Sequence, residues 1–204
     1  MTVTIDGSSG ISSVDGSAAS PSIRGSDANS GILYTSDAIK FSTGGTQRAF
    51  IDNNGLSSVG HILQVQAGKT NNRTEMASTT WQATNLNANI TPTTSSNRVI
   101  VQVNGDCNTN GANNELVLSV FRSINGGTYT NLGNGTYGFM SARCVGSRLH
   151  SAVSIQFTDD PGTTNQINYK VYMARASGDN GNVEFPVNNT WQYAYIHLLE
   201  LATS

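Results

Sequence analysis

The chain has 204 residues, of which 37% are hydrophobic and only 12% are charged, about half the usual charged share. Its formal net charge of −2 gives no electrostatic reason to expect nucleic acid or an anionic membrane as a partner. No stretch resembles a signal peptide or reaches the length of a membrane span, so we expect folding where the chain is made and no membrane insertion. Gly, Ser, Thr and Asn make up the difference, so the surface must be hydrated mainly through hydroxyl and amide groups. This composition is typical of extracellular β-rich adhesive and capsid proteins.

Residues 1–60 carry short apolar bursts, each about the length of one short strand. The bursts are Val3 with Ile5, Ile11 with Val14, Ile32–Tyr34, Ala38–Phe41 and Ala49–Ile51. Turn-forming pairs such as Asp15-Gly16 and Gly44-Gly45 separate them. One chain alone could not bury these bursts, whereas three identical chains around one axis could. The pattern predicts a short, intertwined, β-rich stem in a homotrimer.

Residues 61–204 show the period-two alternation of antiparallel strands. The alternating segments are Val99–Val103, Leu116–Val120, Val153–Phe157 and Ile167–Met173. Two earlier segments, His61–Ala67 and Thr74–Ala83, predict an opening hairpin. No stretch has convincing helical periodicity. The pattern therefore indicates an all-β chain whose second part is a jelly-roll-like antiparallel β-sandwich.

The last predicted strand, Trp191–Leu201, is apolar on both faces. A strand of this kind is buried on both sides, or has one face in the core and the other against a neighbouring subunit. One of its faces carries the aromatic residues that we predict for a trimer interface. These are Trp191, Tyr193, Tyr195 and His197.

The sequence contains no recognisable catalytic or metal-binding constellation. Cys107 and Cys144 lack the spacing of a zinc site; we expect two small buried side chains, with a disulfide as the alternative. The three histidines have no metal-ligand spacing, although a ring of three His197 side chains in a trimer is an alternative. Adjacent Asp159 and Asp160 would point to opposite faces of a strand end and so do not form a catalytic pair. We predict no cofactor, no metal and no enzymatic activity.

A long polar loop at residues 125–137 is the candidate binding segment. It combines aromatic rings with hydroxyl and amide groups, which suits adaptable hydrogen bonding to the sugars of a bacterial surface. The alternative is an ordinary solvent loop. The candidate receptor-binding residues are Thr128, Tyr129, Asn131, Asn134 and Tyr137.

Two parts of the chain resemble tail-fibre proteins of bacteriophages, especially those of cyanophages and other marine phages. The first reads P-x-x-x-G-x-D-x-N-x-G-I over residues 21–32, followed by F-x-T-G-G-T-x-R-x-x-I-D-x-x-G over residues 41–55. The second comprises Gly60–Gln66, Ile90–Pro92, Ser96–Val101, Phe157–Thr164, Tyr169–Val171 and the aromatic-aliphatic end of the chain.

The resemblance implies a homotrimer with a virion-anchoring stem at residues 1–60 and a β-sandwich head at residues 61–204. The long shaft repeats that usually separate these parts are absent, so the family implied is a short form of the fibre. Such a protein assembles in the host cytoplasm, resides in the virion and contacts other virion proteins through its N-terminal region. The implied role is attachment to the host cell; a purely structural role in decorating the capsid or neck is the alternative.

Overall fold

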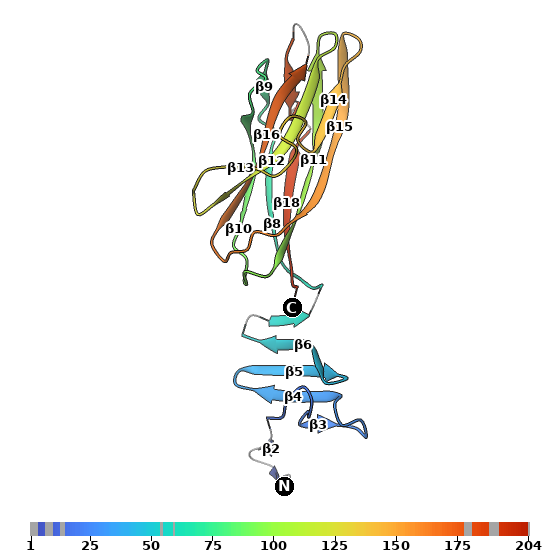
Figure 1. The fold of residues 1–204 in the computed structure, drawn as a ribbon, viewed down its shortest axis with the longest axis vertical. Helices are drawn as coiled ribbons and strands as arrows, with labels where there is room; N and C mark the ends of the chain where they lie inside the picture. The colour runs from blue at the N-terminus through green and yellow to red at the C-terminus, as the bar shows by residue number, and fades with distance from the viewer. Residues whose placement is uncertain are drawn as a thin grey trace. The chain divides into compact units, whose positions relative to one another are not determined.

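The computed structural model describes residues 4–6, 10–12, 15–53, 55–58, 60–177, 181–187 and 192–203, and this part of the chain contains strands and no helix (Figure 1). The strands form antiparallel sheets, which confirms the predicted all-β class. The chain divides into two compact units. The N-terminal unit comprises Met1–His61 with Ala202–Ser204, and the sandwich unit comprises Ile62–Leu201.

The described residues of the apolar bursts lie in short strands, as predicted; Val3 and Val14 lie outside the described residues. A two-stranded ribbon pairs β1 (Thr4–Asp6) with β2 (Gly10–Ser12). A five-stranded sheet then follows the chain order from edge to edge. Its strands are β3 (Ile23–Arg24), β4 (Gly31–Thr35), β5 (Ala38–Thr43), β6 (Thr46–Asp52) and β7 (Gly55–Ser58).

Two loops, one before β3 and one between β3 and β4, are tied to this sheet by backbone hydrogen bonds. The amide of Tyr34 donates to the carbonyl of Asp15 at 2.9 Å, and that of Gly45 donates to the carbonyl of Asn29 at 2.8 Å. Asp27 accepts a bond from the amide of Asn29, which closes an Asx turn within the second of these loops. Leu33 is only 3% exposed, so one face of the sheet is partly covered by the chain itself.

The sandwich unit consists of two antiparallel sheets. In the five-stranded sheet the order is β10-β16-β12-β13, and β14 also pairs with β12. In the six-stranded sheet the order is β8-β18-β11-β17-β9, and β15 also pairs with β11. The bounds are β8 (Ile62–Thr70), β9 (Thr74–Met76), β10 (Gln82–Ile90), β11 (Arg98–Asn110), β12 (Glu115–Ile124), β13 (Thr130–Asn131), β14 (Met140–Arg143), β15 (Arg148–Asp159), β16 (Ile167–Ser177), β17 (Val183–Phe185) and β18 (Ala194–Leu201).

Alternate residues of the strands fill one hydrophobic core between the two sheets. The predicted alternation is confirmed in β11 and β16, where Val101 and Val171 are fully buried while their chain neighbours are half-buried. In β12 the predicted inward residue Leu118 is fully buried, but Val117 and Ser119 on the other face are buried as well. Burial of each such side chain stabilises the fold by about 1.5–3 kcal/mol. Gly68 of β8 lies directly against the backbone of Asn87 in β10, where a Cβ atom would overlap the carbonyl oxygen. A glycine is therefore needed where these two strands meet.

The predicted opening hairpin is wrong. β8 pairs with β18, and β9 pairs with β17, so the two segments lie at opposite edges of the six-stranded sheet. The reason is the central place of β18, because the backbone N–H and C=O groups of a buried strand require hydrogen-bonding partners on both of its edges, which β8 and β11 supply. That need for long-range pairing outweighs the short-range pairing that the intervening turn residues suggested.

A buried carboxylate fixes one end of the sandwich. Glu200 of β18 is fully buried, and its Oε1 accepts bonds from the Thr93 amide at 2.6 Å, the Thr93 hydroxyl at 2.8 Å and Asn97 Nδ2 at 2.7 Å. Its Oε2 accepts a bond from Gln64 Nε2 at 2.6 Å. Burial acts to raise the pKa of Glu200, but these hydrogen bonds outweigh it and hold the pKa below its ordinary value. The network joins β8, β18 and the turn between β10 and β11.

We expect Glu200→Gln to lower the free energy of unfolding at neutral pH by about 2–4 kcal/mol, because an amide would set its N–H group against buried donors. Since the folded pKa is depressed, the carboxylate stabilises the fold above its unfolded pKa of about 4.3, and this contribution is lost as the pH falls through the folded value. Thermal unfolding at pH 7 and pH 3 measures both effects.

Glu75→Gln is the matched control for this change. Glu75 is exposed and pairs with Arg73 at 2.9 Å on the surface. Its replacement should change the free energy of unfolding by less than about 1 kcal/mol. Equal losses of stability in the two variants would contradict the role assigned to the buried carboxylate.

Candidate functional site

One face of the N-terminal five-stranded sheet is apolar and uncovered. Strand alternation places Ile32, Tyr34, Phe41, Ala49 and Ile51 on the face opposite to Leu33. The register sets Ile32 beside Phe41, and Ile39 beside Ile51. The strongly exposed side chains of this sheet are Ile23 (45%), Tyr34 (38%), Ile39 (40%), Phe41 (38%), Ile51 (42%) and Leu56 (52%). We call this surface the stem face.

A sheet with an apolar face is stable when that face packs against another layer. The exposed fractions show that no second layer of the described chain covers the stem face. Contiguous apolar side chains rather than scattered ones are the signature of an association surface. The stem face therefore has the exposed, contiguous apolar character of an association surface.

The residues predicted for a trimer interface lie on the outer face of the six-stranded sheet. Tyr193 and Tyr195 are 40% and 39% exposed, and the ring of Tyr195 stacks with that of His197 at 6.1 Å between centroids. Trp191 lies outside the described residues. The other side of β18 points into the core, so the final strand has one buried face and one outward face.

The same outward face continues onto the neighbouring strands. In the register, Leu199 lies between Val65 of β8 and Ile100 of β11, while His197 lies between Ala67 and Gln102. Val65 is 57% exposed. The middle of this face thus carries aromatic, aliphatic and amide groups, and we call it the β18 face.

The outer face of the five-stranded sheet carries a row of four aromatic rings. Phe121 of β12 stacks on Tyr172 of β16 with centroids 4.0 Å apart and an interplanar angle of 25°. Trp81 lies 5.8 Å from Phe121, and Tyr129 lies 5.7 Å from Tyr172. All four residues are half-buried, and we call them the aromatic row.

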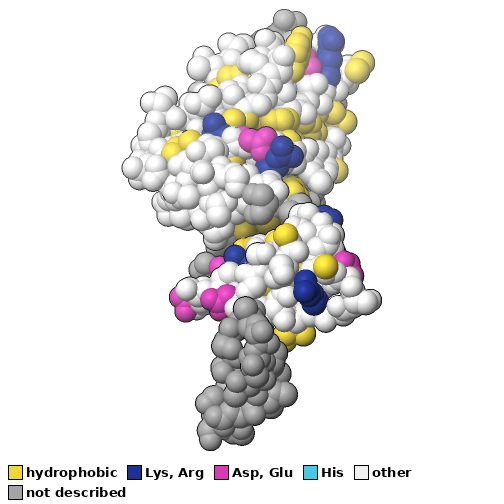
Figure 2. Space-filling view, turned by 60° about the horizontal axis from the view of Figure 1, so that its bottom comes forward, with side chains coloured by type: hydrophobic (Ala, Val, Ile, Leu, Met, Phe, Trp, Pro, Cys, Tyr) yellow, Lys and Arg dark blue, Asp and Glu magenta, His cyan; other side chains and the backbone are white. Residues whose placement is uncertain are grey.

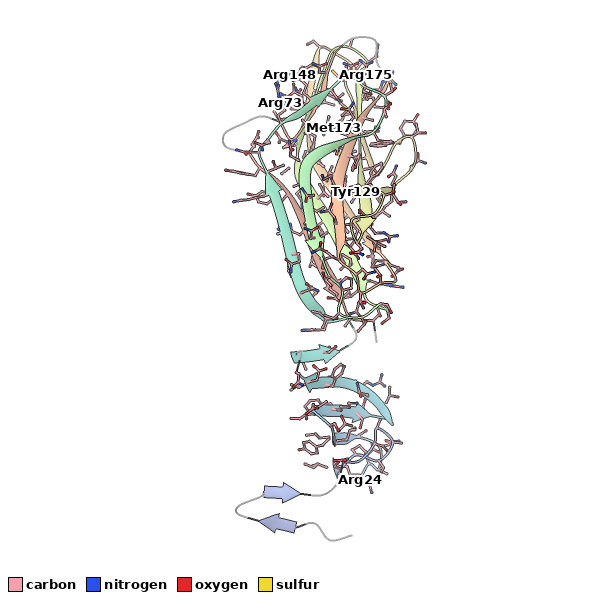
Figure 3. The ribbon with its side chains drawn as sticks, turned by 90° about the vertical axis from the view of Figure 1, so that its left-hand side faces the viewer. Arg24, Arg73, Tyr129, Arg148, Met173 and Arg175 are labelled. Carbon is pink, nitrogen blue, oxygen red and sulfur yellow. The ribbon has the colours of Figure 1, made fainter. Side chains whose placement is uncertain are left out.

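Polar groups border the aromatic row. Lys170 Nζ lies 5.7 Å from the centre of the Tyr129 ring, and the Tyr129 hydroxyl donates to Asn168 Oδ1 at 2.7 Å. Asn168 Nδ2 in turn donates to Asn89 Oδ1 at 2.7 Å and to Asn87 Oδ1 at 3.2 Å. Tyr129 lies near the middle of the sandwich's length, whereas Arg73, Arg148 and Arg175 lie toward one end (Figure 3).

The candidate loop residues separate into three groups. Tyr129 belongs to the aromatic row, while Asn131 and Asn134 hold the loop itself: Asn131 Oδ1 accepts from the Ser119 hydroxyl and the Gly133 amide, and Asn134 Oδ1 accepts from the amides of Thr136 and Tyr137. The side chains of Thr128 and Tyr137 are exposed.

Sequence reasoning missed Trp81, Phe121, Lys170 and Tyr172 as members of the same surface. The sequence alone does not show which outward-facing residues of different strands are neighbours, because this depends on the register between the strands. The alternation did contain a weak signal, because Lys170 and Tyr172 occupy the outward positions of a strand whose inward residues were identified.

The described part of the chain contains no group of three or more His, Cys, Asp or Glu side chains placed to hold a metal ion. Cys107 and Cys144 are buried and not bonded to each other, and burial raises the pKa of the Cys107 thiol to about 11. Asp159 pairs with Arg122 at 2.8 Å and Asp160 with Arg98 at 2.7 Å, so the adjacent carboxylates have separate partners.

The described residues also include no helix of the length and apolarity needed to cross a membrane. A surface hollow of about 580 Å³ lies beside the β18 face. Asp106 and His150 line it; desolvation raises the pKa of Asp106, and the charge of His150 opposes this shift.

No family model matches the chain, and no curated protein sequence matches it. Among solved structures, the VP2 protein of infectious bursal disease virus is 10% identical with a TM-score of 0.30, and the match covers 93% of this chain and 54% of that one. The structure of the Gx strain of this virus gives 10% identity, a TM-score of 0.31 and coverage of 94% and 55%. The chain spans about half the length of these solved chains.

We expect Asn134→Ala to loosen the 130–139 segment without unfolding the protein. The change removes two hydrogen bonds to loop amides, so hydrogen exchange of Thr136 and Tyr137 should accelerate about tenfold. The thermal midpoint should move by less than about 3 °C. Thr128→Ala, at an exposed position of the same loop, is the control and should leave exchange unchanged; equal acceleration in both variants would refute the assignment.

Proposed function

We propose that the protein is a phage virion component, a short homotrimeric fibre that attaches to the host cell and carries out no catalysis. The observation that carries this proposal is the stem face, an apolar sheet surface left without a covering layer. The resemblance of residues 21–32 and 41–55 to phage tail-fibre sequences supports the assignment to the virion. It also supports a role for residues 1–60 in docking to other virion proteins.

Three copies of the sheet can cover one another's apolar faces. Packed around a threefold axis, each stem face covers the edge and face of the next, so that residues such as Phe41 and Ile51 enter a shared core. A closed ring of identical chains also uses up the complementary surfaces, whereas an open arrangement would leave apolar ends that aggregate. The intertwined stem predicted from the sequence is retained in this form of the proposal.

The β18 face supports a second zone of contact between the chains. Aromatic and aliphatic groups at its middle are suited to burial against identical groups, and interfaces favour Tyr over charged residues. Charged side chains are few on the side of the molecule that Figure 2 shows. On the β18 face itself, Lys69 lies opposite Tyr195 in the register, with its Nζ 5.4 Å from the centre of the Tyr193 ring. This contact with an aromatic ring would partly offset the like-charge repulsion between identical Lys69 side chains.

The strand order supports a jelly-roll head. One sheet contains the sequence β8-β18-β11-β15, and the other contains β10-β16-β12-β14. Consecutive strands of the chain thus alternate between the sheets at β8, β10 and β11, as two nested Greek keys require. Both virion and lectin domains use this architecture, and it leaves the outer faces of the two sheets available for different contacts.

We expect the purified chain to sediment as a trimer at micromolar concentration, and the double variant Phe41→Lys with Ile51→Lys to sediment as a monomer. Two buried lysines per chain would cost more than the association gains, because each charge would be desolvated without a partner. Thr46→Lys, at the exposed first residue of β6, is the control and should remain trimeric. A monomeric wild-type chain would end the trimer proposal.

The β18 face is tested separately by chemical proximity. With His197→Cys, oxidation should join two chains of each trimer by a disulfide, because identical residues near a threefold axis approach one another. Asn89→Cys, at an exposed position on the opposite sheet, is the matched control and should stay uncrosslinked. Non-reducing electrophoresis measures the outcome, and the reverse result would assign the interface to the five-stranded sheet.

Attachment and location are tested on virions. Gold-labelled antibody against the sandwich unit should bind at the tail of the particle. Label on the capsid or the neck would instead favour a decorating role.

A further inference from the structure

We propose that the aromatic row on the five-stranded sheet, formed by Trp81, Phe121, Tyr172 and Tyr129, is a binding surface for polysaccharide. The proposal deepens the attachment role given above and rests on it only for the source of the sugar, the surface of a host cell. The ligand class follows from the rings, the amides and the single cation that border them.

The exposure of the rings separates this row from a structural cluster. Tyr169 and Phe185 show how the chain treats aromatic residues of its core, because both are fully buried. The four rings of the row are only half-buried although they touch one another. Apolar ring surface kept at the boundary with solvent suits the flat C–H faces of a sugar, which remain hydrated on their other sides.

Oriented amides supply the polar part of the surface. Asn168 is held by the Tyr129 hydroxyl on one side and by the oxygens of Asn87 and Asn89 on the other. Because the oxygen of Asn89 already accepts a bond, its exposed side chain presents the N–H donors of the amide. Amide donors beside aromatic rings are what hydroxyl-rich ligands require.

Lys170 adds a preference for acidic sugars. It lies opposite Phe121 and Asn87 in the strand register, so its ammonium group projects among the rings and amides. Its contact with the face of Tyr129 holds the cation at the row. A carboxylate of a uronic acid would form an ion pair with the ammonium group as well as a hydrogen bond, whereas a neutral sugar hydroxyl would gain the hydrogen bond alone.

The loop holds the rings in place before any ligand arrives. Trp81 Nε1 donates to the carbonyl of Gly135 at 2.9 Å, and the Phe139 amide donates to the carbonyl of Leu118 at 2.8 Å. Gly138 has a φ of +62°, and a Cβ at this position would overlap the Leu118 carbonyl, so the loop reaches the sheet only with glycine here. Binding then costs little ordering of the rings.

The test uses the full-length protein on an array of purified bacterial capsular and O-antigen polysaccharides, with neutral and uronic-acid-containing members. We expect the wild-type protein to bind, with stronger binding to acidic members. Tyr172→Ala should weaken binding about tenfold or more through loss of ring contact, while Tyr172→Phe should retain it. Lys170→Gln should remove the preference for acidic members and leave binding to neutral ones.

Val145→Ala is the matched control, because Val145 is a strongly exposed apolar side chain (86%) that stands outside the aromatic row. It should bind as the wild type does. A direct readout uses the Trp191→Phe background, in which Trp81 is the remaining tryptophan of the chain's two. Addition of a bound polysaccharide should then shift the Trp81 fluorescence.

Each variant is also checked for its sedimentation and its thermal midpoint, so that loss of folding is not read as loss of binding. Wild-type protein that forms trimers but binds no polysaccharide would overturn the site and leave the fibre proposal standing. Polysaccharide binding by a wild-type chain that stays monomeric would support the site and overturn the homotrimer proposal. Equal binding by Tyr172→Ala, with loss in Tyr137→Ala, would move the site to the tip of the loop.

Discussion

An apolar sheet face has to be covered, and the two units of this chain meet that constraint differently. In the sandwich unit the chain supplies both layers, so Val101 and Leu118 from the two sheets lie buried in one shared core. In the N-terminal unit the chain supplies one sheet, and Phe41 and Ile51 remain exposed. The sandwich unit therefore has a core of its own, whereas the N-terminal sheet leaves one apolar face without a covering layer. In the proposed trimer, association would stabilise the N-terminal sheet by covering that face, and it would add to a stability that the sandwich already has.

The scarcity of charge gives the polar interactions of the sandwich their character. Glu200 lies among neutral donors, and its partners Thr93, Asn97 and Gln64 stabilise the carboxylate without a cation. Amides do similar work at the surface, where Asn168 links β10 to β16 and Asn134 closes a loop. Amide and hydroxyl groups accept and donate at short range, and they leave the surface nearly uncharged. A surface of this kind can approach an identical surface or a sugar with little electrostatic preference for either.

The alternation of inward and outward residues within a strand could be predicted from the sequence, whereas the pairing between strands could not. Alternation at Val99–Val103 and Ile167–Met173 identified inward residues, because a period of two is a local property. The pairing of β8 with β18 joins residues far apart in the chain, so local turn signals favoured a hairpin that does not form. The aromatic row was missed for the same reason. Trp81 and Tyr172 are ninety-one positions apart in number, and only the register of β10, β12 and β16 brings their neighbourhoods together.

The two outer faces of the sandwich differ in a way that bears on affinity. The β18 face has apolar groups such as Val65 and Leu199 at its middle, and its burial between chains would leave the opposite sheet, with the aromatic row, turned toward solvent. A homotrimer would then present three equal rows. Stacking on a half-buried row is a weak contact for one sugar, but a polysaccharide repeats its unit and can reach several rows of one particle. The second contact is intramolecular once the first has formed, so the joint affinity can exceed that of one row by a factor of about 10²–10⁴. In this proposal the low charge and the uncovered stem face allow the chains to associate, and association places several weak sites on one particle. The affinity of the fibre would then be a property of the assembled chains.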